Sequence, residues 1–330
     1  MFILILLSKL NVHKFIYLIY PLRVNPSLPN CMILHFSLLF LGVLATSTSV
    51  IFIKLSQTDA VLLGGYRALF AGIILLPLFI KAIRKNPNQN IEALLYRSLA
   101  PGIFLGVHFA LWNIGARVTP AANSTLIINM LPIITPFLLY AMLRELINRA
   151  EVYGTLLSLA GLVVLGVADY RINESHALGD AICLVSLILY AFYMMWGRKN
   201  RDIPSLWLYV VPLYLIAGIA TMLVLFFGNI VGLMDVDPLR YNTLREFSLI
   251  LALVLIPTVI GHTILNYSLK HLRGQTVSII VLSQFIFGGM LGYLYLDEIP
   301  GPVFYIASVL IVIGALIVII AVQPSRTKTE

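Results

Sequence analysis

The chain has 330 residues, of which 60% are apolar and only 11% are charged, and its mean hydropathy is +0.97. A soluble globular domain carries about a quarter charged residues, so this composition excludes that class of protein. The net charge of +8 would suggest a nucleic-acid partner in a soluble protein, but here the basic residues lie between long apolar runs. We therefore predict an integral membrane protein without a nucleic-acid partner.

Ten apolar runs reach, or nearly reach, the roughly 20 residues that a helix needs to cross a bilayer. Lipid offers no water to backbone groups, so runs of this length form helices and not barrel strands. The longest connection, 228–246, is too short for an extramembrane domain. The predicted fold is an all-α bundle of ten transmembrane helices, at residues 32–53, 60–80, 98–116, 119–143, 152–168, 177–196, 206–227, 247–269, 275–296 and 303–322.

The two ends of the chain lie outside these spans. Residues 1–31 are apolar but are interrupted by Lys9, Lys14, Arg23 and three prolines, so no stretch reaches spanning length. Two interpretations stay open for this leader: an interfacial segment, or a misassigned start with Met32 as the true initiator. Residues 323–330 are expected to form a short cytoplasmic tail.

An internal duplication is visible in the sequence. Residues 113–166 and 266–319 align without a gap at an offset of 153, with nine identities in 54 positions. Five identities pair apolar residues, which recur by chance in such a chain. The informative ones are Asn113 with Asn266, Tyr140 with Tyr293, Glu145 with Glu298 and Gly161 with Gly314. We therefore predict two repeats, residues 32–168 and residues 177–322.

The distribution of basic residues predicts the orientation of the chain, because Lys and Arg favour cytoplasmic loops. With the N-terminus inside, 16 of the 22 Lys and Arg lie inside, five lie outside and Arg67 lies within a span. Each repeat has five spans, an odd number, so the second must cross the membrane in the opposite direction. We predict inverted repeats in a bacterial cytoplasmic (inner) membrane, with both termini in the cytoplasm. Internal repeats of this kind are typical of transporters.

Polar and aromatic side chains within the spans are the candidate site residues, because such groups are costly in lipid unless they face a cavity or another helix. His108 and Trp112 share a helix face, and His262 and Asn266 repeat that spacing in the second copy. A purely structural role is the alternative for each residue taken alone, but for the set we favour a shared cavity. The predicted substrate-binding residues are His108, Trp112, Asn113, Asn129, Tyr190, Tyr193, His262, Asn266 and Gln284.

Titratable groups inside the spans are few. Imidazole titrates near neutral pH, and no Asp or Glu lies at mid-membrane depth, so His108 or His262 could carry a coupling proton. Arg67 lies about two turns from the outer end of its span. We interpret it as structural, either reaching toward the interface or pairing with Asp59.

Several short patterns recur in both copies. The first has Trp112-Asn113, Ala121-Ala122, a proline-containing apolar helix closed by Leu143-Arg144-Glu145, and a glycine-containing helix over 154–166; the second has Asn266 to Leu269, Val277-Ser278, Leu296-Asp297-Glu298 and Gly314. Together with Lys54 at the end of the first span and Arg67 in the second, these features resemble the EamA family of the drug/metabolite transporter superfamily, and the likeness covers residues 32–322.

The resemblance implies ten helices in two inverted five-helix repeats, with a central cavity lined by spans 1, 3, 4, 6, 8 and 9. It also implies transport of amino acids, other metabolites or toxic compounds. The sequence departs from the family pattern in the ninth span, where the family often has proline. Phe285 and Gly289 align there with Pro132 and Pro136 of the fourth span. Whether both halves bend alike is left open by this difference.

We predict a secondary transporter that exports small organic metabolites such as amino acids by alternating access. The chain has no phosphate-binding loop motif, and we expect no cofactor, no metal site and no enzymatic activity. One alternative is a membrane-embedded enzyme acting on lipid, for which Asp235, Asp237 and Glu246 form the only acidic concentration in a loop. The other is a non-transporting subunit of a membrane assembly.

Overall fold

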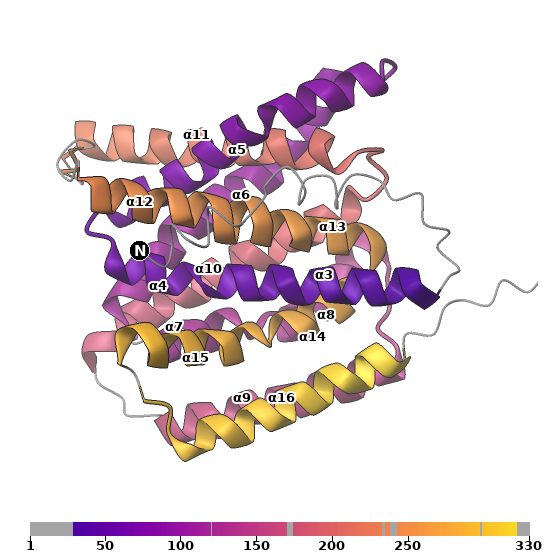
Figure 1. The fold of residues 1–330 in the computed structure, drawn as a ribbon, viewed down its shortest axis with the longest axis vertical. Coiled ribbons are helices and arrows are strands. Elements are labelled where there is room, and N and C mark those ends of the chain that lie inside the picture. The colour runs from indigo at the N-terminus through magenta and orange to yellow at the C-terminus, as the bar shows by residue number, and fades with distance from the viewer. Residues whose placement is uncertain are drawn as a thin grey trace, which may run out of the picture.

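The computed structural model describes residues 29–119, 121–169, 174–232, 235–237, 243–297 and 299–321. The tail, Glu298 and nearly all of the predicted leader lie outside them. Within the described residues the chain is helical and forms one bundle (Figure 1). Its elements are α3 (Pro29–Ser47), α4 (Ser49–Leu55), α5 (Ala60–Lys85), α6 (Ile91–Val118), α7 (Ala121–Ile128), α8 (Leu131–Leu143), α9 (Arg149–Asp169), α10 (Glu174–Lys199), α11 (Leu206–Ile230), α12 (Leu244–Leu253), η1 (Val254–His262), α13 (Thr263–His271), α14 (Gly274–Val281), α15 (Gln284–Leu296) and α16 (Pro302–Ala321).

The described residues contain nine helices that are long and apolar enough to cross a membrane. Four of the nine are built from shorter elements: α3 with α4, α7 with α8, α12 with η1 and α13, and α14 with α15. The predicted span 152–168 falls on α9, a 21-residue helix that is not among the nine. The chain is thus an integral membrane protein, and the count of ten stays a prediction that depends on α9.

The two repeats break their fourth helix at equivalent positions. α7 ends at Ile128 and α14 at Val281, while α8 begins at Leu131 and α15 at Gln284. Both pairs differ by 153 residues, the offset found in the sequence alignment. The ends of α8 and α15 keep the same offset, and each is followed by a residue in the left-handed conformation (φ 53° and 55°).

The two breaks agree in the backbone although their residues differ. In the first copy, Pro132 lies at the start of α8 and cannot donate a backbone hydrogen bond. In the second copy no proline is present, yet the Ser283 N–H bonds to the Ile280 carbonyl three residues back, in the same tight turn that the Met130 N–H forms with the Ile127 carbonyl in the first copy. Both halves therefore bend alike, which answers the question left open by Phe285 and Gly289.

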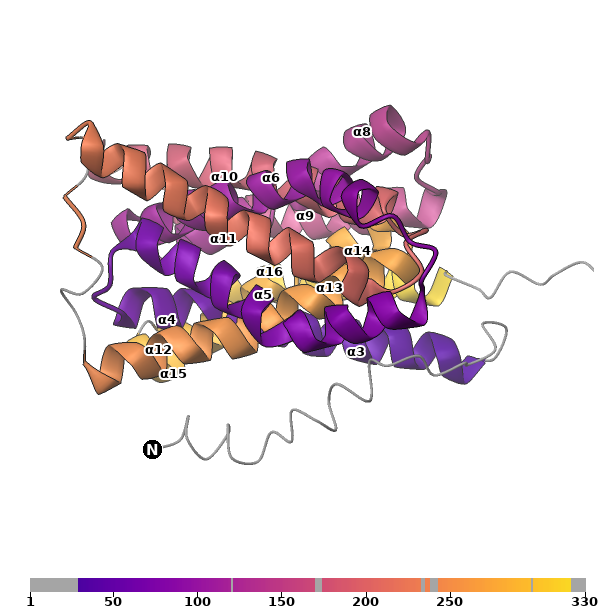
Figure 2. The same cartoon turned by 90° about the horizontal axis from the view of Figure 1, so that it is seen from above.

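α5 packs against α11, its counterpart in the second repeat, and the two run antiparallel (Figures 1 and 2). Glycines permit the close approach: a Cβ on Gly72 would lie 2.7 Å from the Leu215 side chain, and one on Gly218 would lie 2.6 Å from the Leu69 backbone nitrogen. Because a helix that runs antiparallel to its own counterpart has been turned over, this packing identifies the repeats as inverted.

α9 and α16, the fifth helices of the repeats, pair in the same antiparallel way along the opposite flank (Figure 1). A Cβ on Gly161 would lie 2.8 Å from the Ala307 carbonyl oxygen, and one on Gly314 would lie 2.6 Å from the Gly154 carbonyl oxygen. The offset of 153 residues relates Gly161 to Gly314 and Gly154 to Ala307, so each contact is the repeat counterpart of the other. The pair Gly161 and Gly314, identical in the sequence alignment, therefore lies about a local two-fold axis.

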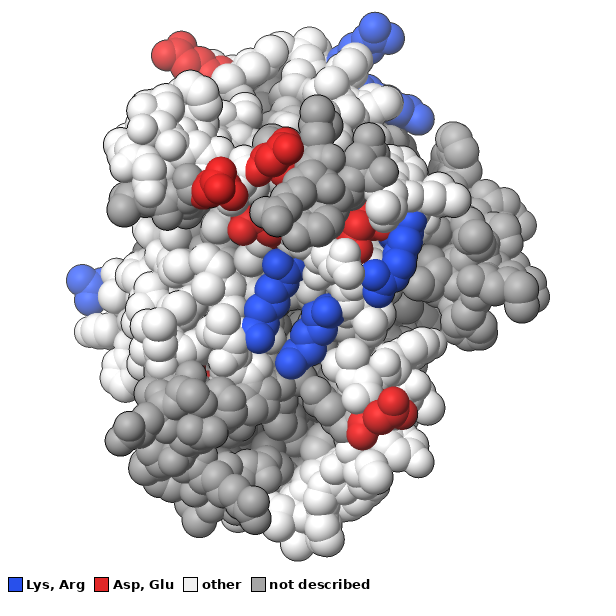
Figure 3. Space-filling view, turned by 90° about the vertical axis from the view of Figure 1, so that its left-hand side faces the viewer, with Lys and Arg blue, Asp and Glu red and all other residues white. Residues whose placement is uncertain are grey.

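The bundle has two chemically different ends, which we name after residues that they contain. α3 begins and α16 ends at the Arg273 end (Figure 1), where 11 basic and four acidic side chains are described. The described side chains of the Glu246 end, shown in Figure 3, include the basic Lys54, Arg117 and Arg245 and the acidic Asp59, Asp180, Asp235, Asp237, Glu246 and Asp297.

We expect Gly218→Ala to lower the free energy of unfolding by about 1–3 kcal/mol, because the new methyl group meets backbone that cannot move aside. The thermal unfolding midpoint of the purified protein in detergent measures this effect. Gly301→Ala is the matched control, since nothing lies within 4 Å of a Cβ at that position. Equal midpoints for the two variants would contradict the close α5–α11 packing.

Candidate functional site

Helices of both repeats enclose a cavity of about 40 Å³ beside the helix breaks. This volume holds only a few water molecules, so the structure represents a compact state of the site. The cavity is lined by Thr46, Ser47, Ser49, Val50, Arg67, His108, Trp112, Thr125, Ile128, Tyr190, His262 and Gln284.

A larger groove of about 610 Å³ lies between α5 and α12 near the Glu246 end. Its wall includes Phe70, Ile73 and Phe247, whose side chains are exposed on the flank of the bundle, and at the Glu246 end it also includes polar residues such as Arg117 and Asp235. A flank of apolar side chains is the surface that a membrane protein presents to lipid tails. We therefore take the enclosed cavity, and not this groove, as the candidate site.

Aromatic rings form one wall of the cavity. The His108 ring stacks on Tyr190 at 4.8 Å between centroids, and its Nδ1 lies 2.8 Å from the Ser186 hydroxyl. The His262 ring meets Phe109 edge-on at 5.1 Å. Phe109 and His262 are equivalent positions of the two repeats, so this contact lies where the copies meet. Flat rings at this junction can stack against a planar or apolar ligand.

A hydrogen-bonded chain leads from the cavity toward the Arg273 end. Asn266 Nδ2 donates to the Tyr193 hydroxyl at 2.6 Å and to the His262 carbonyl at 2.8 Å. The Tyr193 hydroxyl lies 3.5 Å from His262 Nδ1. All three side chains are buried. Tyr193 and Asn266 therefore support His262 from behind and close the cavity on that side.

Arg67 is the one Lys or Arg among the described residues that line the cavity, and its side chain is buried. Its Nε donates to the Thr258 hydroxyl at 3.1 Å, and its Nη1 donates to Ser49 at 3.2 Å. The guanidinium carbon lies 3.8 Å from the centre of the Phe109 ring, a cation–π contact. The expected pairing with Asp59 is wrong, because the Asp59 carboxylate caps α5 by accepting from the N–H groups of Val61 and Leu62.

The predicted site residues fall into three groups by position. Five line the cavity: His108, Trp112, Tyr190, His262 and Gln284. Tyr193 and Asn266 lie directly behind His262. Asn113 and Asn129 lie off the cavity wall, where Asn113 donates to the Ala60 carbonyl at 2.9 Å and Asn129 to the Thr125 carbonyl at 2.7 Å.

Sequence reasoning missed Arg67 as a cavity residue. The π-helical turn η1 places a partner for Arg67. The Thr258 hydroxyl bonds to the Leu253 carbonyl five residues back and lies beside Arg67. Such widened turns are frequent at functional sites but have no clear sequence signature. The available signal was the charge itself, since an ionisable residue inside a span is a candidate site residue by default.

Comparison with known proteins agrees with this architecture. The family model described as the EamA-like transporter family matches residues 34–167 and again residues 177–320. The chain belongs to the EamA-like transporter family. The resemblance found in the sequence patterns is thereby confirmed, and with it membership of the drug/metabolite transporter superfamily.

Solved structures share the fold of this EamA-like chain. One, described only as a crystal structure of a protein, superposes with a TM-score of 0.67 at 17% sequence identity and covers 86% of this chain and 96% of its own. No curated protein matches the chain by sequence. Every span that the family resemblance placed around the cavity contributes a lining residue, and the second span adds Arg67.

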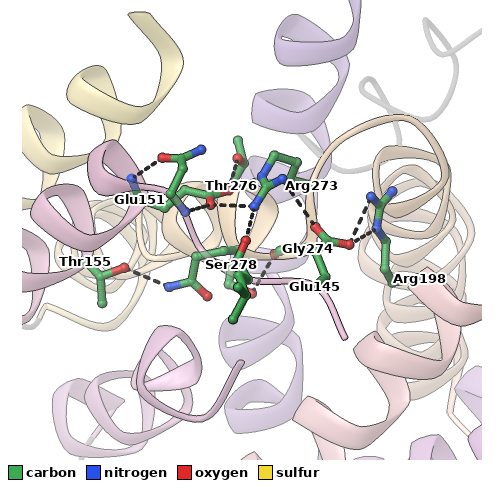
Figure 4. Close-up of polar contacts among 11 residues, drawn as sticks. Glu145, Glu151, Thr155, Arg198, Arg273, Gly274, Thr276 and Ser278 are labelled. Carbon is green, nitrogen blue, oxygen red and sulfur yellow. Dashed lines mark hydrogen bonds and ion pairs between the residues drawn. The ribbon is translucent and has the colours of Figure 1, made fainter. Parts of the chain in front are cut away.

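A cluster of ion pairs joins the two repeats of the EamA-like chain at the Arg273 end (Figure 4). Arg273 donates to both carboxylate oxygens of Glu151, at 2.8 and 2.9 Å, and also lies 4.0 Å from Glu145. Arg198 donates to Glu145 at 3.2 Å through two nitrogens. The hydrogen bonds that Arg273 donates to Glu151 raise the pKa of Arg273 above its ordinary value, so it stays charged.

The Glu246 end is joined differently, through one carboxylate and a short loop. Glu246 Oε2 accepts from the hydroxyls of Ser56 and Thr58 at 2.6 and 3.0 Å and from the backbone N–H of Gln57 at 3.0 Å. These bonds attach the α4–α5 connection to the start of α12. Among the described residues, Glu246 has one ion pair at this end, a 3.8 Å contact with Arg245, whose side chain is exposed.

We expect Arg273→Gln to lower the free energy of unfolding by about 2 kcal/mol, because the fully buried Glu151 loses its cation. The expected loss lies below the usual value for a buried pair because Arg273 is partly exposed. The double variant Glu151→Gln/Arg273→Gln should recover more than half of it.

The thermal unfolding midpoints of the single and double variants provide the measurement for this cycle. Arg97→Gln is the control, because it breaks the exposed pair with Asp202 and should cost less than about 1 kcal/mol. Additive losses in the Glu151 and Arg273 cycle would show that the two side chains do not depend on each other.

Proposed function

We propose that the chain is a secondary transporter that exports small organic metabolites such as amino acids, by alternating access around the central cavity. The observation that carries this proposal is the position of the cavity. It lies between two inverted repeats, beside helices that are interrupted at the same place in each copy. Secondary transporters bind substrate at such sites, because interrupted helices leave backbone and polar groups available in a place that excludes lipid.

The ion pairs at the Arg273 end support alternating access. Opening the cavity toward this end requires Arg198 and Arg273 to separate from Glu145 and Glu151, which come from the other repeat. Glu151 is fully buried and Arg198 and Glu145 are largely buried, so these pairs hold the closed state, and opening must replace each of them by contacts with water. We propose that the Arg273 end faces the cytoplasm of a bacterium, with its basic residues retained on that side.

The two alternative functions, an enzyme acting on lipid and a non-transporting subunit, have less support than transport. An enzyme acting on lipid needs a cluster of acidic or metal-binding groups at the membrane surface. Within the described residues no group of three His, Cys, Asp or Glu could hold a metal ion, and the Glu246 carboxylate is engaged by the α4–α5 loop. A non-transporting subunit has no need for an enclosed polar cavity. Family membership also favours transport.

We expect purified protein in liposomes to exchange amino acids across the membrane. Counterflow of a mixture of radiolabelled amino acids into preloaded vesicles measures this activity. His262→Ala should reduce the flux at least tenfold at an unchanged level of folded protein, because it removes a cavity wall at the junction of the repeats. Tyr96→Ala, at an exposed position outside the cavity, is the control. Flux that is equal in liposomes with and without the protein would reject the transporter.

We propose further that a proton is coupled to transport through His108 or His262. Both imidazoles line the cavity, and no Asp or Glu does so among its described lining residues. When net uptake into liposomes is measured with an imposed pH gradient, an ionophore that removes the gradient should lower the flux of the natural protein. It should leave the residual flux of His108→Asn/His262→Asn unchanged. A natural protein that is insensitive to the ionophore would contradict the coupling.

A further inference from the structure

The central cavity carries a positive charge that no carboxylate among its described lining residues balances. Arginine is protonated at any physiological pH, and an unpaired charge buried in a membrane protein is strongly unfavourable. The described residues that line the cavity contribute Arg67 and no Asp or Glu. The Asp59 carboxylate of the same helix lies about two turns away and caps the helix start. The charge is therefore available to a ligand.

The geometry of the guanidinium points in the same direction. Its Nε and Nη1 donate to the hydroxyls of Thr258 and Ser49, and its flat face rests on Phe109. The buried Nη2 has no hydrogen-bond partner among the described residues. A buried donor without a partner is costly, and in native proteins it is usually explained by a ligand or water. Three contacts hold the side chain in place while one nitrogen remains unused.

The rest of the cavity wall describes the ligand that would fit. Thr46, Ser47 and Ser49 line the cavity together with Arg67, as do the rings of Trp112 and Tyr190. A planar carboxylate matches the guanidinium plane, and one cation balances one negative charge.

We propose that Arg67 is the anion-binding subsite of the cavity, and that the substrate is a small monocarboxylate with an aromatic or apolar body. This inference rests on the proposed transport function, whose substrate class it narrows. Arg67 donates from Nη2 to a carboxylate oxygen, and the ring wall contacts the body of the substrate. The compact cavity must widen to admit it, which agrees with a carrier that opens and closes.

Matched pairs of compounds test the charge directly. Phenylacetate is compared with phenylacetamide, and L-phenylalanine with L-phenylalaninamide, because each pair differs chiefly at the carboxylate. Binding to the purified full-length protein is measured from the rise in its thermal unfolding midpoint over a concentration series. We expect each carboxylate to bind at least about tenfold more tightly than its amide, as for a hydrogen bond to a charged group.

Three variants assign the preference to one side chain. Arg67→Gln should abolish the preference for carboxylates, and Arg67→Lys should retain part of it, since lysine keeps the charge. Arg117→Gln is the matched control. This arginine donates to the Ile53 and Ser56 carbonyls and lines the larger groove between α5 and α12, not the cavity. A merely structural Arg67 would change the midpoint of the ligand-free protein without changing the ratio between carboxylate and amide.

Three results would overturn the inference. The first is equal binding of carboxylates and amides, or no binding of either, by the natural protein, which decides the matter even where Arg67→Gln does not fold. The second is an unchanged preference in Arg67→Gln. The third is loss of the preference in Arg117→Gln alone. Amino-acid counterflow that continues undiminished in Arg67→Gln would refute this subsite and leave the transporter intact, whereas absent counterflow in the natural protein would refute the transporter.

Discussion

Backbone groups in the middle of a bilayer have no water to bond with, and this constraint organises the structure. A helix can be interrupted at that depth only where protein or a polar cavity receives its free groups. The breaks between α7 and α8 and between α14 and α15 satisfy this condition, because both adjoin the cavity between the repeats. The position of the site thus follows from where the chain can stop being helical.

The course of the chain could be predicted from the sequence because span length and duplication are recorded in patterns many residues long. The break in the second copy could not, because no proline marks Leu282 and Ser283 and the tight turn depends on packing. The π-helical turn at Val254–His262 was missed for the same reason. Local backbone departures of one or two residues are determined by tertiary contacts, which periodicity does not contain.

The candidate site was predictable in composition but not in arrangement. Trp112 and Gln284 could be selected because polar and aromatic residues stand out within apolar spans, and both reach the cavity. Asn113 met the same criterion, yet it bonds to the Ala60 carbonyl and holds α6 to the start of α5. Arg67 also met the criterion, but the interface and Asp59 offered simpler partners in the sequence, which favoured a structural role. Which polar residue serves packing and which serves a ligand is decided by neighbours on other helices.

Arg144 and Asp297, the two non-glycine residues in the left-handed conformation within the described part of the chain, occupy the same place in each repeat but carry opposite charges. In an inverted duplication they lie on opposite faces of the membrane, and a basic residue is favoured on one face only. Evolution could therefore keep the shape of this corner in both copies while reversing its charge. The left-handed conformation at this position shapes the backbone, whereas the charge of its side chain influences which way the repeat crosses the membrane. The two repeats can therefore differ in charge at this position and still share one fold.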